Sequence, residues 1–160
     1  MKNLDNLYNL TEKENIKVKK KDFEEFQANG LCLYNTKKCN IYLNKDIETE
    51  TEEKCVLAEE IGHYKTGIDF NLLSTDKEYD KITRSINEFR AKKWAVNELI
   101  PFEQFRRFLD TNYTKFEIAN EIGVTEELLD IACFIYEPML YDERKWSHGK
   151  TWKWGGYYLL

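Results

Sequence analysis

The stretch Leu57-Ala58-Glu59-Glu60-Ile61-Gly62-His63-Tyr64 decides the fold and carries the candidate chemistry. It differs by one residue from the pattern H-E-x-x-H, in which two metal ligands share one face of a helix and a glutamate follows the first. Glu59 stands where that pattern has its first histidine, whereas Glu60 and His63 occupy the other two places. Two interpretations stay open: Glu59 is a carboxylate ligand, or the metal site has been lost.

The spacing of this stretch predicts the orientation of its side chains. An α-helix has 3.6 residues per turn, so Glu59 and His63 share one face and Glu60 lies beside them, whereas Leu57 and Ile61 point into the core. A catalytic zinc site offers protein ligands and one open position for water, and a carboxylate outside the ligand set can accept a proton from that water. We therefore predict Glu59 and His63 as ligands and Glu60 as the general base.

A third ligand has to come from another segment, and Glu88 is the candidate. Glu88, Ala91, Ala95 and Leu99 follow one another at steps of three and four, which places them on one stripe of a long helix. The two alanines allow a second helix to approach closely below Glu88. The site is expected to take Zn²⁺. Mn²⁺ is the alternative, because the set contains carboxylates and harder metals prefer oxygen ligands.

Hydrophobic periodicity predicts an α+β fold that is mostly helical, with a small three-stranded sheet and an active-site helix. Thr49 and Glu52 form the signature of a capping box at the start of that helix. Pro101 ends the long helix that follows. The expected elements are a helix over residues 3–14, a strand from Ile16, a hairpin over 31–34 and 40–43, and helices over 49–65, 76–100, 102–110, 114–122 and 125–137.

Length, composition and charge limit the classes of protein to which this chain can belong. The chain has 160 residues, of which 42% are hydrophobic, so we expect residues 1–160 to form a single domain. Its core would lie in 4–135, and the aromatic tail 141–160 would cover that core. The net charge of −5 argues against a general nucleic-acid surface. With no signal-peptide pattern and no apolar span for a membrane, a cytoplasmic location is expected.

Three segments resemble the ImmA/IrrE family of metallopeptidases: residues 55–64, the pattern E-x-x-A-x-x-W-A-x-x-x-L-I-P at 88–101, and residues 118–127. The likeness covers roughly residues 4–135, in the same order and spacing. It implies a zincin-like domain whose active-site helix packs near a small sheet. It also implies a cytoplasmic enzyme of phages, other mobile elements or stress responses that cleaves a helix-turn-helix repressor and so relieves repression, acting as an anti-repressor.

By position, the resemblance implies that His63 is the second histidine ligand, Glu60 the general acid/base and Glu88 the downstream carboxylate ligand. Glu59 departs from the family pattern, which has histidine there. The chain is therefore interpreted as a zinc metalloendopeptidase with a variant E-E-x-x-H motif. The alternative is a catalytically silent zincin-like module that binds a repressor or another protein without cutting it.

Residues 118–129 also resemble a helix-turn-helix with Gly123 at its turn. The segment that would read DNA, residues 125–131, contains three acidic residues and no basic one, so it would repel phosphate. We expect a packing element or a protein contact there and no direct contact with nucleic acid.

Overall fold

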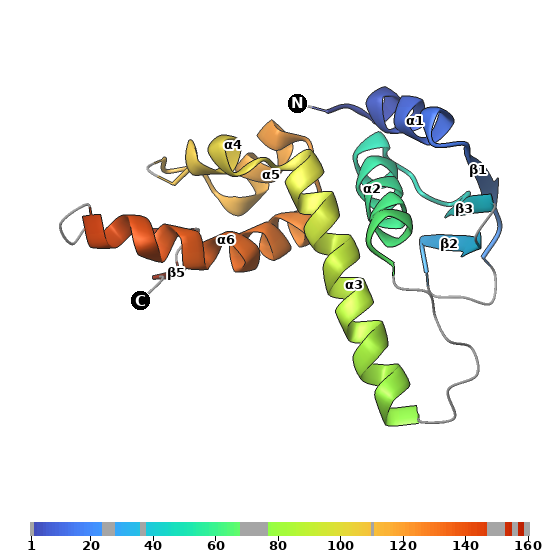
Figure 1. Cartoon of the computed structure of the whole chain (residues 1–160). Helices are drawn as coiled ribbons and strands as arrows, with labels where there is room; N and C mark the ends of the chain where they lie inside the picture. The colour runs from blue at the N-terminus through green and yellow to red at the C-terminus, as the bar shows by residue number, and fades with distance from the viewer. Residues whose placement is uncertain are drawn as a thin grey trace.

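The computed structural model describes residues 2–23, 28–35, 38–67, 77–109, 111–146, 153–154 and 157–158. It confirms a mostly helical α+β fold with one small three-stranded sheet (Figure 1). Among the described residues, no helix is long and apolar enough to cross a membrane. The elements are α1 (Leu4–Lys13), β1 (Ile16–Lys21), β2 (Gly30–Asn35), β3 (Lys38–Asn44), α2 (Glu50–Thr66), α3 (Lys77–Leu99), α4 (Phe102–Arg106), α5 (Lys115–Ile122), α6 (Glu126–Trp146), β4 (Lys153–Trp154) and β5 (Tyr157–Tyr158).

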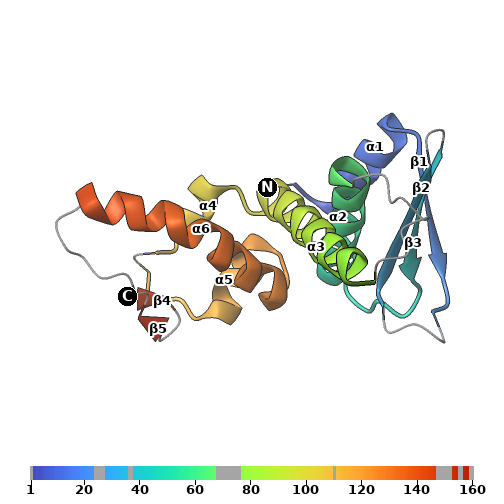
Figure 2. The same cartoon turned by 60° about the horizontal axis from the view of Figure 1, so that its bottom comes forward.

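The elements are arranged in layers around α2. The sheet has the order β1-β3-β2, with β1 parallel and β2 antiparallel to β3, so β2 is an edge strand. Figure 2 shows α1 and α2 beside the sheet, α3 on the far side of α2, and α4 to α6 beyond α3. The helix that carries the motif is therefore enclosed between the sheet and α3.

Helix α2 begins and is anchored as its sequence predicts. The Thr49 side chain accepts a hydrogen bond from the backbone N–H of Glu52 at 3.1 Å. The Glu52 carboxylate, expected to complete a capping box, accepts instead from the side chain of Asn29 at 3.0 Å. Leu57 and Ile61 are fully buried. This apolar face fixes the rotation of the helix, so the polar side chains of the motif point away from the core.

Helices α2 and α3 cross closely where Gly62 faces Ala91. A Cβ atom on Gly62 would lie 2.5 Å from the carbonyl oxygen of Ala91, well inside van der Waals contact. Ala91 and Ala95 are fully buried, which confirms that the small residues of α3 admit a second helix. The crossing brings the motif on α2 next to Glu88 on α3.

Gly62→Ala is expected to lower the free energy of unfolding by roughly 1–3 kcal/mol, because the added methyl group overpacks the crossing. In an uncrowded helix the same change would raise the free energy of unfolding by about 1 kcal/mol. A decrease therefore indicates that the added methyl group collides with Ala91 of α3. Urea denaturation measures it, with the exposed Ser85→Ala on α3 as a control that should change little. A more stable Gly62→Ala protein would contradict the close crossing.

Two predicted helix ends were wrong. Helix α4 ends at Arg106, four residues early, and α6 continues through Pro138 to Trp146 instead of ending at 137. Proline removes one backbone hydrogen bond from a helix, but packing holds α6 on both sides of it. The Tyr136 hydroxyl donates to the carbonyl of Ile100 at 2.7 Å, and Leu140 is buried. The expected covering of the core by residues 141–160 concerns side chains outside the described part of the structure.

Candidate metal centre

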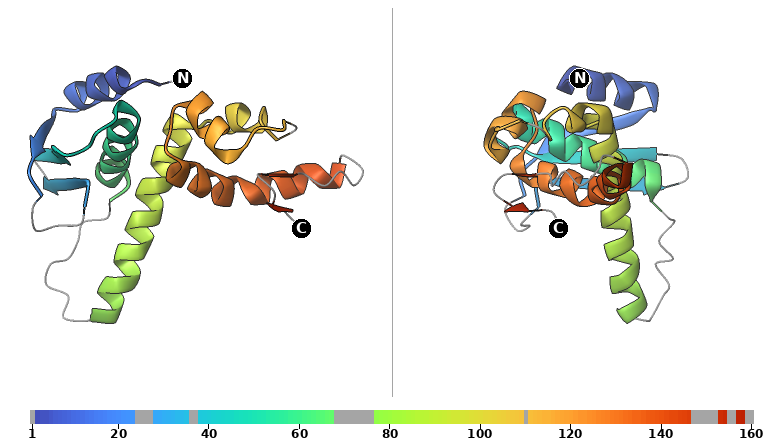
Figure 3. Two further views of the ribbon diagram at one scale, coloured as in Figure 1. Left: turned by 180° about the vertical axis from the view of Figure 1, so that it is seen from behind. Right: turned by 90° about the vertical axis from the view of Figure 1, so that its left-hand side faces the viewer.

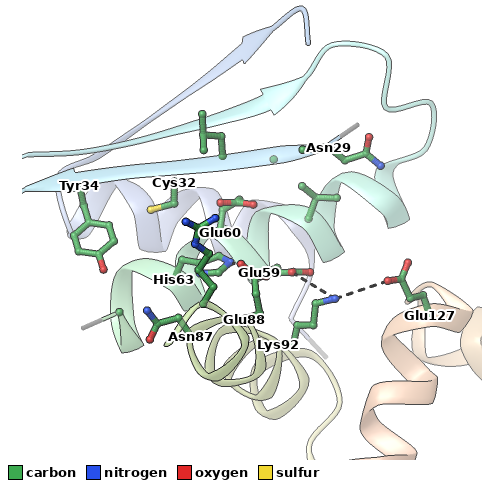
Figure 4. Close-up of a pocket in the computed structure, with 16 residues that line it drawn as sticks. Asn29, Cys32, Tyr34, Glu59, Glu60, His63, Asn87, Glu88, Lys92 and Glu127 are labelled. Carbon is green, nitrogen blue, oxygen red and sulfur yellow. Dashed lines mark ion pairs between the residues drawn. The ribbon is translucent and has the colours of Figure 1, made fainter. Parts of the chain in front are cut away.

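A cleft of about 570 Å³ lies where α2, α3 and the edge strand β2 meet (Figure 4). In Figure 4, β2 runs above α2, and α3 lies below α2. Its polar walls include Asn29 before β2, Glu59, Glu60 and His63 on α2, Asn87, Glu88 and Lys92 on α3, and Glu127 at the start of α6. The structure thus brings all four predicted site residues to one cleft.

Three of these residues present ligand atoms to a common point. The carboxylates of Glu59 and Glu88 and the ring of His63 each offer one atom, and these atoms lie within 4.8 Å of one another. The His63 Nε2 and Glu88 Oε2 atoms are 3.6 Å apart. Ligands each about 2.0–2.2 Å from a zinc ion are at most about 4.4 Å apart, so small side-chain rotations bring this set into range. One nitrogen and two oxygen donors fit a divalent metal ion.

Glu60 is held in the wall of the cleft behind these atoms. Only 8% of the residue is exposed, and its carboxylate accepts a hydrogen bond from the backbone N–H of Cys32. Gly30 leaves room for it, because a Cβ there would lie 2.5 Å from Oε1. Burial and the carboxylates of Glu59 and Glu88 raise the pKa of Glu60 to about 8. A cation bound nearby would lower this pKa and favour the basic form.

Burial also shifts the pKa values of two proposed ligands. It raises the pKa of Glu59, against the opposing effect of Lys92. It lowers the pKa of His63, against the opposing effect of Glu88. Neutral imidazole is the form that binds a metal, whereas a carboxylate ligand must lose its proton. Burial therefore favours the neutral, metal-binding form of His63. It disfavours the ionised form of Glu59, which a nearby cation would have to stabilise.

A cation that the sequence analysis missed already lies beside Glu59. The Lys92 Nζ atom is 3.8 Å from Glu59 Oε1 and 3.9 Å from Glu127 Oε1, as the dashed lines in Figure 4 mark. Lys92 follows Glu88 by one helical turn, and this spacing could have indicated that it belongs to the same cluster. Its ammonium group neutralises part of the negative charge and would compete with a metal ion for Glu59.

Lys92→Ala is expected to tighten zinc binding about tenfold, because the ammonium group repels a zinc ion bound at Glu59. Between unit charges about 4 Å apart such an interaction is worth on the order of a few kcal/mol before screening by salt. Isothermal titration of metal-stripped protein with zinc chloride measures the change. Lys93→Ala is the matched control, since the neighbouring lysine lies outside the cleft lining. Unchanged or weaker binding by Lys92→Ala would mean that Lys92 does not compete for Glu59.

Asn87 is a second cleft residue that no sequence motif indicates. It is 7% exposed, and its Oδ1 atom is buried without a hydrogen-bond partner in the described part of the chain. A buried unpaired acceptor is costly. Its place next to Glu88 puts this uncompensated polar group in the wall of the candidate site.

Comparison with known proteins identifies a family. The family model described as the IrrE N-terminal-like domain, peptidase M78, matches residues 11–134. Searches among curated proteins and among solved structures found no match. The matched segment spans more than half of the chain and includes Glu59, Glu60, His63 and Glu88. The family implies a metallopeptidase-type function acting on protein. The chain belongs to the peptidase M78 family of IrrE N-terminal-like domains.

Proposed function

We propose that this chain is a metal-dependent endopeptidase in which Glu59, His63 and Glu88 hold the ion and Glu60 is the general base. The observation that carries the proposal is the convergence of the three ligand atoms within 4.8 Å in a cleft that Glu60 lines. When bound, a divalent ion polarises a peptide carbonyl and lowers the pKa of water in its open coordination position.

The role proposed for Glu60 is proton transfer. Its carboxylate would accept the proton of the attacking water and then donate it to the leaving nitrogen of the cleaved peptide bond. The backbone N–H of Cys32 holds the carboxylate in place and leaves its other lone pairs available. The absence of a side chain at Gly30 keeps the carboxylate from being displaced.

The edge strand β2 supports a peptide as substrate. β2 has β3 on one side only in its sheet, and Gly30, Leu31, Cys32 and Tyr34 line the cleft. An extended peptide can add to such an edge through main-chain hydrogen bonds. A chain bound in this way would pass beside Glu60, with its scissile bond over the three ligand atoms.

The finer identity of this peptidase rests on the sequence resemblance. We propose Zn²⁺ as its ion, with Mn²⁺ as the second candidate because two of the three donors are carboxylates. The proposed substrate is a helix-turn-helix repressor whose cleavage relieves repression, in the cytoplasm of a cell that carries a phage or another mobile element. We further propose that residues 1–160 act as one domain.

A catalytically silent module that binds a protein in the same cleft is the second candidate. The ion pair of Lys92 with Glu59 favours it, because this cation gives the carboxylate a partner without any metal. Such a module would keep the cleft and the β2 edge and would bind a repressor without hydrolysis.

Titration of the metal-stripped protein with zinc chloride, and then with manganese chloride, separates the two candidates. Saturable binding of one equivalent, followed by metal-dependent cleavage of a helix-turn-helix repressor, would support the peptidase. Binding of neither metal, together with tight binding of an intact repressor, would support the silent module.

A further inference from the structure

An exposed apolar stripe follows the side of α3 that faces away from the metal cleft. Ile82, Ile86 and Phe89 succeed one another at steps of four and three, so they share one face of the helix. They are 57%, 44% and 44% exposed. At about 100° per residue, Asn87 and Glu88 lie on the opposite face. The stripe is therefore separate from the candidate metal centre.

The stripe continues from α3 onto α6. Phe134 of α6 is 66% exposed, and its ring meets that of Phe89 edge to face, with the centroids 6.2 Å apart. Figures 1 and 3 show that the N-terminal half of α3 projects beyond α2 and α6, so this half of the helix is accessible from the side. We refer to Ile82, Ile86, Phe89 and Phe134 as the α3 stripe.

Positive charge borders the α3 part of the stripe. A shallow hollow over it is lined by Lys81, Arg90 and Lys93 together with stripe residues of α3, and no carboxylate is among the lining side chains that the structure describes. None of these three cations forms an ion pair with another residue that the structure describes. The chain as a whole has a net charge of −5, so this basic rim runs against the overall charge. A rim of one sign selects a partner of the other sign.

The charges also argue against a second copy of the chain on this surface. A symmetric dimer would place the same patch against itself. Lys81, Arg90 and Lys93 would then face the cations of the other copy, and such like-charge contacts are repulsive. A partner with carboxylates at the edges of an apolar ridge is the complementary occupant.

We propose that the α3 stripe binds an amphipathic helix of a partner protein, whose apolar ridge is flanked by Asp and Glu. From Ile82 to Phe89 the stripe extends about 10 Å along α3, at 1.5 Å per residue, which matches two turns of a partner helix. The apolar centre supplies affinity, and the basic rim fixes the orientation. The proposal does not depend on whether the cleft cuts peptides.

Fluorescence anisotropy of the full chain with two designed helical peptides tests this proposal. Both peptides have about 20 residues, so that they can form a helix, and both carry leucines at helical spacing. One is flanked by glutamates and the other by lysines. The glutamate peptide is expected to bind at least about tenfold more tightly than the lysine peptide. Ile86→Ser should weaken its binding about tenfold, and Lys93→Glu should reduce the preference.

Lys17→Glu, which reverses an exposed charge on β1, is the matched control and should leave both affinities unchanged. Circular dichroism checks that the variants are folded. Equal affinity for the two peptides, or binding of neither, would overturn the proposal. Sedimentation that showed a dimer abolished by Ile86→Ser would also overturn it, because the face would then belong to a second copy.

Discussion

Glu60→Gln is expected to reduce peptide cleavage by at least about 100-fold, the usual contribution of a positioned general base. Glutamine has the same shape, and its amide oxygen can still accept the backbone N–H of Cys32, so the cleft should keep its form. The amide cannot take a proton from water. Because Glu60 is not among the three converging ligands, the affinity for zinc should change by no more than a few fold.

Glu103→Gln is the control for this experiment, since it makes the same chemical change on an exposed side chain of α4. Cleavage rate and zinc affinity are measured on the same preparations. If Glu60→Gln and the parent cleave a repressor equally fast, proton transfer by Glu60 is not the mechanism. If neither protein cleaves and both bind the repressor, the silent module is the better description.

The parts of the fold that the sequence predicted are those with local signals. Thr49 caps α2 through its own neighbour Glu52, and Leu57 and Ile61 set the buried face of the helix by spacing alone. The same reasoning placed Glu88 above Ala91, and the structure brings Glu88 to the motif. In each case the decisive information lies within about two helical turns.

The parts that were missed depend on contacts between distant segments. The importance of Gly62 comes from the carbonyl of Ala91 on another helix, and that of Gly30 from the Glu60 carboxylate. α6 continues past Pro138 because Tyr136 is hydrogen-bonded to Ile100. A proline normally indicates a helix end, and only tertiary packing could overrule that signal.

The charge balance of the site likewise depends on contacts between distant segments, which sequence spacing does not predict. Sequence spacing indicated which side chains share a helix face, but the ion pairs of Lys92 join three helices, α3 with α2 and α6. The question that the sequence left open, whether Glu59 is a ligand or a remnant, thus becomes a competition between a metal ion and Lys92 for one carboxylate. The zinc affinities of the parent and of the Lys92→Ala and His63→Ala variants measure this competition.

His63→Ala is expected to weaken zinc binding by at least about 100-fold, because it removes the one nitrogen donor of the three-residue set. Two carboxylates would remain, and Lys92 lies 3.8 Å from one of them, so the remaining cluster would favour the ammonium group over the metal. The fold should persist, since the His63 side chain is 20% exposed and lies at the cleft rather than in the apolar core. Isothermal titration with zinc chloride, with circular dichroism for the fold, measures both expectations.

Tyr64→Phe is the control for His63→Ala, because it changes the neighbouring residue of α2 and leaves its ring packed against Tyr34. Unchanged zinc affinity in a folded His63→Ala protein would remove His63 from the ligand set, and with it the proposed peptidase mechanism. Loss of binding in His63→Ala, combined with tighter binding in Lys92→Ala, would show that the metal and Lys92 compete for one site. The exchange of histidine for Glu59 would then have weakened the metal centre without abolishing it.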